Sequence, residues 1–270
     1  MSKRKNLVLG GKGFVGAELV RLLEEKGEEI RIIDRKLGDD LKHAEKYAEM
    51  FEWADRTWFI AWEIGIWKHA TDPAYQIGTL AASIDLCKSV FGALEKAKKP
   101  FLFVSTQFAG YPSVLGSVKR VGEVWTTLLG GLTARFWNVY GFEEIGEKSH
   151  VVPDMIYNAL TKKRITLLTN GEETRQFLFV RDAAEGLLHQ FETGQPVADI
   201  TNGEWVSIKS VADMIAAKTG TVVETGDGTG HASFAEPKNI LSGWSPRFTL
   251  DEGLALTIDR IRESMQQKQT

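Results

Sequence analysis

The segment 6–34 constrains the fold of this chain more than any other. Its apolar run "NLVLG" is typical of a strand, and "FVGAELVRLLEEKG" follows with apolar residues at helical spacing. "EIRIID" then returns to the pattern of a strand. Strand, helix and strand in this order form the unit of a parallel sheet. We therefore expect the chain to open with such a unit.

The glycines of "GGKGFVG", between the first strand and its helix, indicate a dinucleotide-binding turn. Gly10 allows a tight turn, Gly13 lets the backbone approach a pyrophosphate, and Gly16 lets the helix pack closely on the strand. The start of the helix offers unpaired N–H groups and a partial positive charge to phosphates. Asp34 ends the second strand about twenty residues later, where a carboxylate can bind the adenosine ribose.

The charges around Asp34 bear on the choice between NAD and NADP. The carboxylate of Asp34 repels a 2′-phosphate and favours NAD, whereas the adjacent Arg35 and Lys36 could attract one. We therefore expect NAD, with NADP less favoured. The cofactor-binding residues that we expect are Gly10, Gly13, Phe14, Val15, Gly16, Asp34, Arg35, Ala61 and Lys119.

The pattern of the unit continues along the first half of the chain. Strand candidates "RTWFIAW", "PFLFVS" and "LTARFWNV" alternate with helical patterns around residues 74–98 and 113–129. This alternation predicts an α/β fold with a Rossmann-type, doubly wound parallel sheet. The stretch "RKLGDDLKHAEKYAEMFEWAD" before "RTWFIAW" is mostly helical in character, so we expect the usual third strand to be lost or vestigial.

The rhythm changes after about residue 142. Helical patterns in "VVPDMIYNALTKK", "DAAEGLLHQFE" and "SIKSVADMIAAKTG" surround short strands in "RITLL" and "TRQFLFV". We expect residues 1–141 to form an NAD(P)-binding domain. Residues 142–270 are predicted to form a smaller α/β substrate lobe, partly interleaved with the first domain.

Composition excludes several classes of partner. The formal net charge of −3 gives no reason to expect a nucleic-acid partner, because such binding needs clustered, uncompensated Lys and Arg. The apolar run near the N terminus is too short for a signal peptide or a membrane span. The single Cys87 cannot form an intramolecular disulfide and suits a reducing cytoplasm. We expect a cytoplasmic protein without a metal site or a membrane partner.

Tryptophan is frequent, and several of these residues crowd one region. Packing of large aromatic side chains or an interface would explain the crowding, and so would a platform on which a ligand stacks. The residues of this group are Trp53, Trp58, Trp62 and Trp67.

Taken in order, these motifs resemble the NAD-dependent epimerase/dehydratase family, the extended short-chain dehydrogenases/reductases. "GGKGFVG", "WFIAW", "FLFVSTQ" and "KRVGE" are similar to its N-terminal motifs, and "RFWNVYG", "ETRQFLFVRDAAEG", "ITNGEWVSIKSVADMI" and "GWSPRFTLDEGL" to its later landmarks. The resemblance covers nearly the whole chain. It implies a nucleotide-activated sugar as the substrate, and a homodimer formed through the helices near residues 74–98 and 113–129.

The catalytic set of that family is a Ser or Thr, a Tyr and a Lys. Thr106 matches the first, with Ser105 its less favoured substitute, and Lys119 matches the lysine. In the family the lysine lowers the pKa of the tyrosine and hydrogen-bonds the nicotinamide ribose, while the tyrosine transfers the hydroxyl proton. Leu115 stands at the position of this tyrosine, and an apolar side chain cannot transfer a proton.

Two further positions depart from the family pattern. Gln107 stands where dehydratases of the family often carry an acid, and an amide cannot act as a general acid near neutral pH. Phe59 takes the place of a frequent histidine. We therefore consider Glu63 and Tyr111 as replacements for the tyrosine; Tyr140 is expected to pack in the interior, and His69 and His150 are weaker candidates.

Two matches concern the substrate. Asn138 before "VYG" and Arg175 in "ETRQF" stand where the family uses an amide and a guanidinium on the sugar-nucleotide diphosphate. The planar guanidinium suits a diphosphate because it donates two hydrogen bonds. As alternatives, Arg175 could form a surface or interdomain ion pair, and Asn138 could cap its own turn.

The resemblance thus implies an NAD(P)-dependent epimerase, dehydratase or reductase that acts on a nucleotide-activated sugar. Its active site would be atypical, since the usual tyrosine is missing. One alternative is a catalytically impaired NAD(P)-binding sensor or accessory protein of the same fold. Another is an enzyme whose base is Glu63 or Tyr111.

Overall fold

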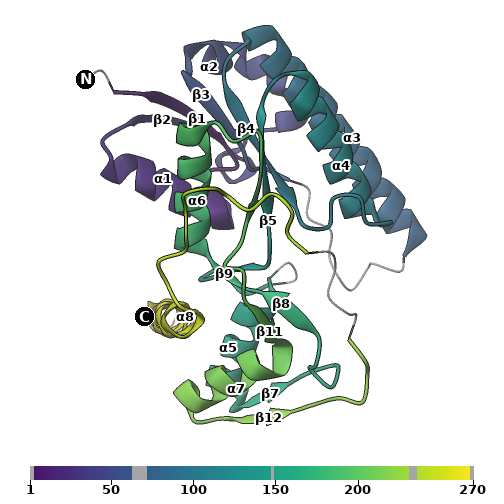
Figure 1. Cartoon of the computed structure of the whole chain (residues 1–270), viewed down its shortest axis with the longest axis vertical. Coiled ribbons are helices and arrows are strands. Elements are labelled where there is room, and N and C mark those ends of the chain that lie inside the picture. Colours follow the sequence, from purple (N-terminus) through teal and green to yellow (C-terminus); the bar gives the residue numbers. More distant parts are fainter. Residues whose placement is uncertain (1–2, 63–71, 147–148, 231–235, 268–270) are drawn as a thin grey trace. The chain divides into compact units, whose positions relative to one another are not determined.

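The computed structural model describes residues 3–62, 72–146, 149–230 and 236–267 (Figure 1). The chain forms two compact units. The first unit comprises Met1–Phe136, Ala183–Ile200 and Lys238–Trp244, and the second unit comprises Trp137–Asp182, Thr201–Pro237 and Ser245–Thr270. The predicted functional domains, residues 1–141 and 142–270, remain a prediction. In the structure, residues 183–200 and 238–244 belong to the first compact unit.

The first unit is built on a six-stranded parallel sheet with the order β10-β5-β4-β3-β1-β2. Helices cover both faces, with α3 and α4 on one and α1 and α6 on the other (Figure 1). This doubly wound arrangement confirms the predicted fold class. The strands are β1 (Lys5–Leu9), β2 (Glu29–Ile33), β3 (Arg56–Phe59), β4 (Phe101–Thr106), β5 (Leu132–Phe136) and β10 (Val197–Ile200); the helices are α1 (Phe14–Glu25), α2 (Ala48–Trp53), α3 (Pro73–Ala97), α4 (Val114–Leu128) and α6 (Val180–Thr193).

The segment between β2 and β3 is helical, as predicted. It forms two short 3-10 helices, η1 (Arg35–Leu37) and η2 (Leu41–Tyr47), followed by α2. The Asp40 carboxylate caps η2 by accepting a hydrogen bond from the N–H of Lys42. In the described part of the chain, β2 is therefore the outermost strand on its side of the sheet.

The strand β10 escaped prediction. Its sequence is only "VADI" and has a charged residue in the middle. The buried carboxylate of Asp199 accepts hydrogen bonds from the N–H groups of Lys238 and Asn239, at 3.0 and 2.8 Å. The segment at residues 238–239 thus supplies hydrogen bonds to a buried carboxylate. The local sequence pattern does not show these partners, so an aspartate here argues against a buried strand.

Two predicted strands are each divided in two. "LTARFWNV" yields β5 and then β6 (Val139–Tyr140), which pairs with β9 in the second unit. "TRQFLFV" yields β8 (Thr174–Gln176) and β9 (Leu178–Phe179). Continuous apolar patterning concealed both breaks, because pattern alone does not show where the pairing partner changes.

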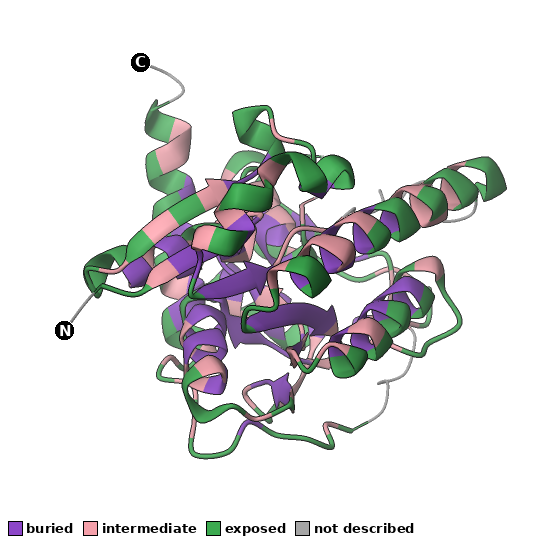
Figure 2. Cartoon of the chain, turned by 90° about the horizontal axis from the view of Figure 1, so that it is seen from above, coloured by how far each residue is buried: buried purple, intermediate pink, exposed green. Residues whose placement is uncertain are grey.

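Aromatic and aliphatic side chains form the core of the first unit, and most residues of β1, β3 and β4 are buried (Figure 2). Phe59, Phe91 and Phe103 contact one another, with ring centroids 5.2–5.6 Å apart. Cys87 is buried with them. Helix α3 also has the length and composition of a membrane span, with a mean hydropathy of 1.4 over its most apolar window. Core helices of soluble proteins can have the same length and hydropathy, so these values alone are weak evidence that α3 spans a membrane.

The second unit combines short strand pairs with helices. Strand β6 pairs with β9, β8 with β11 (Trp205–Ser207), and β7 (Arg164–Thr166) with β12 (Val222–Glu224). Helix α5 (Val151–Lys162) packs against α7 (Ile208–Thr219) and α8 (Leu250–Gln267). Buried Ile156, Ile215 and Leu254 contribute to its interior.

Candidate active site

Of its three predicted glycines, the turn between β1 and α1 leaves the most space beside Gly13. Gly10 has φ +89°, and a Cβ there would lie 2.8 Å from the backbone of Ala61. A Cβ on Gly16 would lie 2.0 Å from the carbonyl oxygen of Gly10. Gly13 caps α1, and a Cβ on it would meet, among the described residues, only the Gly10 oxygen at 3.2 Å. The turn therefore fits the close approach of a pyrophosphate at Gly13.

Asp34 fastens this turn to the end of β2. It is 7% exposed, and one carboxylate oxygen accepts a hydrogen bond from the N–H of Lys12 at 2.8 Å. The other accepts from the N–H of Lys36, also at 2.8 Å. A carboxylate has about four acceptor positions, so it retains capacity for ribose hydroxyls. The donor set and the space at Gly13 together fit a dinucleotide.

The other predicted cofactor residues surround this turn. Phe14 and Val15 begin α1, and Arg35 begins η1. The N–H of Ala61 donates to the carbonyl of Leu9 at 2.8 Å, which extends β3 alongside β1. All four therefore belong to the same unit as the glycines.

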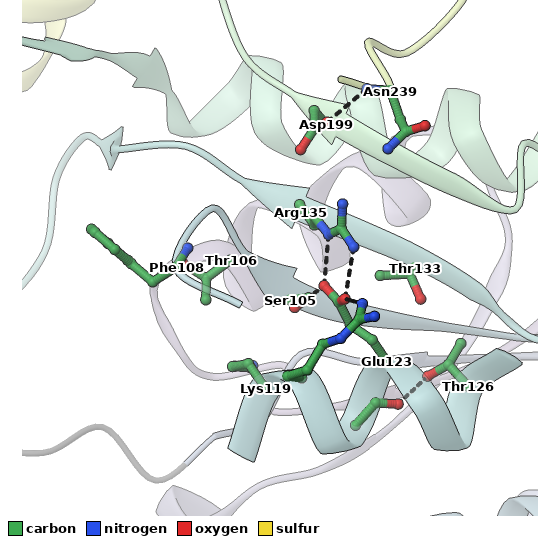
Figure 3. A network of polar contacts seen from close by, with 12 residues as sticks. Ser105, Thr106, Phe108, Lys119, Glu123, Thr126, Thr133, Arg135, Asp199 and Asn239 are labelled. Carbon is green, nitrogen blue, oxygen red and sulfur yellow. Dashed lines mark hydrogen bonds and ion pairs between the residues drawn. The ribbon is translucent and has the colours of Figure 1, made fainter. Parts of the chain in front are cut away.

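Ser105 and Thr106, at the end of β4, have different surroundings. The Ser105 hydroxyl donates to Glu123 at 2.8 Å, and Arg135 donates two hydrogen bonds of 2.7 Å to the same carboxylate (Figure 3). Arg120 adds a third cationic contact at 2.9 Å. Thr106 instead accepts a long hydrogen bond, 3.3 Å, from the N–H of Phe108. Adjacent strand residues point to opposite faces, so Ser105 is committed to Glu123 and Thr106 is not.

Glu123 is ionised within this network. Burial works to raise its pKa, but the hydrogen bonds from Arg135 and Ser105 outweigh burial and hold the pKa below its usual value. This carboxylate therefore joins α4 to β5 through an ion pair with Arg135, and to β4 through the hydrogen bond from Ser105. Neither Arg135 nor its role was predicted; a charged residue within an apolar strand was the available signal.

Lys119 lies in the interior of the first unit. It is 5% exposed, and its ammonium donates to the carbonyl of Val104 at 2.7 Å. The ammonium also lies 3.7 Å from the ring centroid of Trp62 and 4.9 Å from that of Phe103. Burial lowers the pKa of Lys119 to about 7, against the opposing influence of Cys87 and Glu123. Trp62 was predicted only as a member of an aromatic cluster, so its contact with the lysine is new.

The candidates for proton transfer are separated in the chain. Leu115, in the first turn of α4, is 40% exposed. Tyr111 lies in the turn before α4, where its N–H donates to the carbonyl of Phe108 at 2.8 Å, and its side chain is exposed. Glu63 and His69 lie outside the described residues.

The predicted substrate residues both belong to the second unit. Arg175 is on β8, opposite Val206 of β11, and donates to the carbonyl of Thr174 at 2.7 Å. Burial lowers its pKa, while Glu173 acts to raise it. The carbonyl of Asn138 accepts from the N–H of Leu178 at 3.0 Å, where β6 meets β9.

Tyr140 and His150 have structural surroundings. Tyr140 is buried against Phe177 and Phe179, and burial raises its pKa. His150 caps α5 and contacts Glu143 at 3.0 Å; the hydrogen bond to that carboxylate raises the histidine pKa.

Comparison with known proteins agrees with this geometry. The sequence profile of the NAD dependent epimerase/dehydratase family matches residues 6–116 and 128–202. The chain is 24% identical to UDP-glucuronic acid decarboxylase 1 of Xenopus tropicalis, over 98% of this chain and 73% of that protein. It superposes with a TM-score of 0.84 on an epimerase of Methanothermobacter thermautotrophicus, at 19% identity, over 98% of this chain and 94% of the other.

A second solved structure has the same fold. It is an NAD dependent NDP-hexosamine 5,6-dehydratase of tunicamycin biosynthesis, with a TM-score of 0.82, 18% identity and coverage of 97% of this chain and 98% of the other. The family profile includes the glycine turn and Asp34 but omits residues 117–127, which contain Lys119 and Glu123. The match nevertheless covers most of the chain and confirms both the resemblance and the assignment of NAD as the cofactor: the chain belongs to the NAD dependent epimerase/dehydratase family.

Proposed function

We propose that this chain is an enzyme that uses NAD to transform a nucleotide-activated sugar. The observation that carries the proposal is the glycine turn, which leaves space at Gly13 and is fastened to Asp34 through the N–H of Lys12. The names of its relatives include a UDP-glucuronic acid decarboxylase and an NDP-hexosamine dehydratase, so a sugar nucleotide is the substrate class that we infer. Epimerisation, dehydration, decarboxylation and ketone reduction are the reactions to be tested.

In this proposal the N-terminal residues of the first unit hold the cofactor. The N–H groups at the start of α1 bind the pyrophosphate, and the Asp34 carboxylate accepts from the adenosine ribose hydroxyls. Bound NAD would supply a hydride acceptor. Gly10 and Gly16 act indirectly, because their lack of a Cβ permits the close packing of the turn with Ala61 and with itself.

Recognition of the sugar nucleotide is assigned to the second unit. The guanidinium of Arg175 would donate two hydrogen bonds to diphosphate oxygens, a geometry that lysine cannot reproduce. Its partial burial supports this role, since a desolvated cation binds an anion more strongly than an exposed one. Asn138 would add an amide contact beside it.

At the reacting carbon we assign the hydroxyl of Thr106 to orient the substrate oxygen. The commitment of Ser105 to Glu123 supports this choice over the serine. Lys119 is assigned to the nicotinamide ribose. The proton has to move through another group than Leu115, and Tyr111 and Glu63 are the candidates.

We also propose a homodimer formed through α3 and α4. Apolar residues are exposed on both helices, most strongly Ile77 at 67% and Leu128 at 75%. Burial of such residues against a second copy would remove apolar surface from water. The other large apolar residues that are exposed on these helices are Ile84, Leu115, Val121 and Val124.

Binding and turnover should be tested separately. Calorimetric titration of the chain with NAD tests the cofactor site, and UDP-glucose and UDP-glucuronic acid are the first substrate probes. Products should be identified by mass spectrometry and NMR, because a hydride that returns to the product leaves the absorbance of reduced nicotinamide unchanged. NAD binding with a new product supports the proposal. Binding without any product across a panel of sugar nucleotides would point instead to a sensor or accessory protein.

A further inference from the structure

The ammonium of Lys119 is enclosed by groups from several elements. Val104 on β4 supplies a carbonyl at 2.7 Å, and the Trp62 indole lies over the ammonium at 3.7 Å. Phe103 contributes a second ring, at 4.9 Å. With 5% of the residue exposed, Lys119 is largely shielded from solvent in this arrangement.

Trp62 connects this lysine with the glycine turn. Its ring contacts Phe59 and Phe103, with centroids 6.3 and 5.7 Å apart. The preceding residue, Ala61, packs directly against Gly10. A single short segment after β3 therefore touches the first glycine of the turn and covers the lysine.

The other charged and titratable groups near Lys119 come from α3 and α4. Cys87 of α3 is a buried thiol, and burial raises its pKa to about 11, so it is uncharged near neutral pH. Glu123 of α4 interacts with the lysine but is already bound by Arg120 and Arg135. The aromatic face of Trp62 is therefore a main stabilising contact of the ammonium.

We propose that Trp62 is a positioning residue of the cofactor site, because its indole holds the Lys119 ammonium against Val104 and has to turn aside before the lysine can reach the nicotinamide ribose. This inference rests on the role proposed above for Lys119. NAD affinity is then lower than it would be without Trp62, because the indole–ammonium contact has to be broken when NAD binds. For a desolvated cation–π pair this corresponds to roughly 2- to 30-fold in dissociation constant.

The test is a double-mutant cycle on NAD affinity, measured by calorimetry. Trp62→Leu removes the aromatic face but keeps an apolar side chain, and it should tighten NAD binding by roughly 2- to 30-fold. Trp62→Phe retains a ring and should have a smaller effect. In the background of Lys119→Met, Trp62→Leu should leave NAD affinity unchanged, because the contact that it relieves is no longer present.

A matched control comes from a second tryptophan that covers a cation. Trp53 lies 4.3 Å from the guanidinium of Arg31, on β2. Trp53→Leu removes a comparable contact without touching Lys119, so NAD affinity should not change. Thermal unfolding of each variant establishes that it is folded before binding is measured.

Proton uptake gives a readout that a purely structural tryptophan would not affect. The pKa of the enclosed lysine is about 7, so at pH 8 a contact with the ribose that favours the ammonium should draw in part of a proton. Titrations in buffers of different ionisation enthalpy measure this uptake. It should be larger in Trp62→Leu, where loss of the indole face that stabilises the ammonium leaves the free lysine less protonated, and absent in Lys119→Met.

The outcomes separate this inference from the proposed function. If the parent binds NAD and Trp62→Leu changes neither affinity nor proton uptake, the role of Trp62 is wrong while the cofactor site stands. An equal gain in affinity with and without Lys119 would also overturn it, since the tryptophan would then simply obstruct the ligand. If neither the parent nor any variant binds NAD, the proposed function fails and this inference fails with it.

Discussion

The two ends of the candidate site, both in the first unit, are predicted from the sequence to differ in how far they keep the family pattern. The turn between β1 and α1 has its glycines where backbone packing requires them, and Asp34 is bound to the N–H of Lys12. The start of α4 has Leu115 at the expected tyrosine position, and its lysine lies beneath Trp62. Cofactor binding at the glycine turn depends on backbone geometry. The role proposed for the start of α4 depends on which side chains can reach the ligand. Cofactor binding and proton transfer can therefore change independently.

The largest effect is expected from Gly13→Val, which changes the glycine turn between β1 and α1. Its side chain would fill the space meant for the pyrophosphate, and NAD binding should fall below detection in calorimetry. Thermal unfolding should establish that the variant is folded, since a Cβ at Gly13 would lie 3.2 Å from the Gly10 oxygen and requires a small local adjustment. The matched variant Gly78→Val, on α3 with open space around it, should bind NAD like the parent. Tight binding by Gly13→Val would contradict the assignment of the turn.

Glu123→Gln tests whether the ion pairs of Glu123 stabilise the packing of α4, the helix that carries Lys119, against β5. It should lower the free energy of unfolding by about 3 kcal/mol at pH 7, because Arg135 loses the partner of a buried pair. Urea unfolding measures the loss. The folded state lowers the Glu123 pKa, so this contribution is present above the unfolded pKa and disappears as the pH falls through the folded pKa.

The difference between parent and variant should accordingly shrink below about pH 4. Arg120→Ala is the control: its side chain is 56% exposed, and the loss should stay within about 1 kcal/mol. Equal losses in the two variants would mean that the network is a surface feature without structural weight.

Leu115→Tyr sharpens the comparison by introducing the tyrosine that the family resemblance leads us to expect at this position. The position is partly exposed, so the ring can be accommodated, and a phenol one helical turn from Lys119 should raise turnover of a sugar nucleotide by roughly 10- to 100-fold. The assay is the rate of product formation at saturating NAD. A lower rate would indicate that a substitute group already occupies the site, and Tyr111→Phe and Glu63→Gln would then identify it.

Arg175→Ala tests substrate recognition separately from both ends, because Arg175 belongs to the second unit. Loss of a bidentate contact with a diphosphate should weaken binding of UDP-glucose by about 2 kcal/mol, or roughly 30-fold. NAD affinity should stay at the parent value. An unchanged dissociation constant for every sugar nucleotide that the parent binds would remove Arg175 from the site.

The same contrast explains what could be predicted from sequence. The βαβ opening, the glycine turn and the helical segment after β2 depend on local patterning, and all were predicted correctly. The strand β10 was missed because Asp199 finds its partners about forty residues later, at Lys238 and Asn239. The enclosure of Lys119 could not be predicted either, since it arises where β3, β4 and α4 meet.

The double hydrogen bonding of Asp34 has a consequence for protein engineering. Replacing the acid at the end of the second strand is an obvious way to redesign a dinucleotide site for a phosphorylated cofactor. In this chain the substitution would also release the N–H groups of Lys12 and Lys36, and with them the anchoring of two loops. A redesign would do better to keep Asp34 and vary the exposed Arg35, so that coenzyme preference is altered without loosening the scaffold.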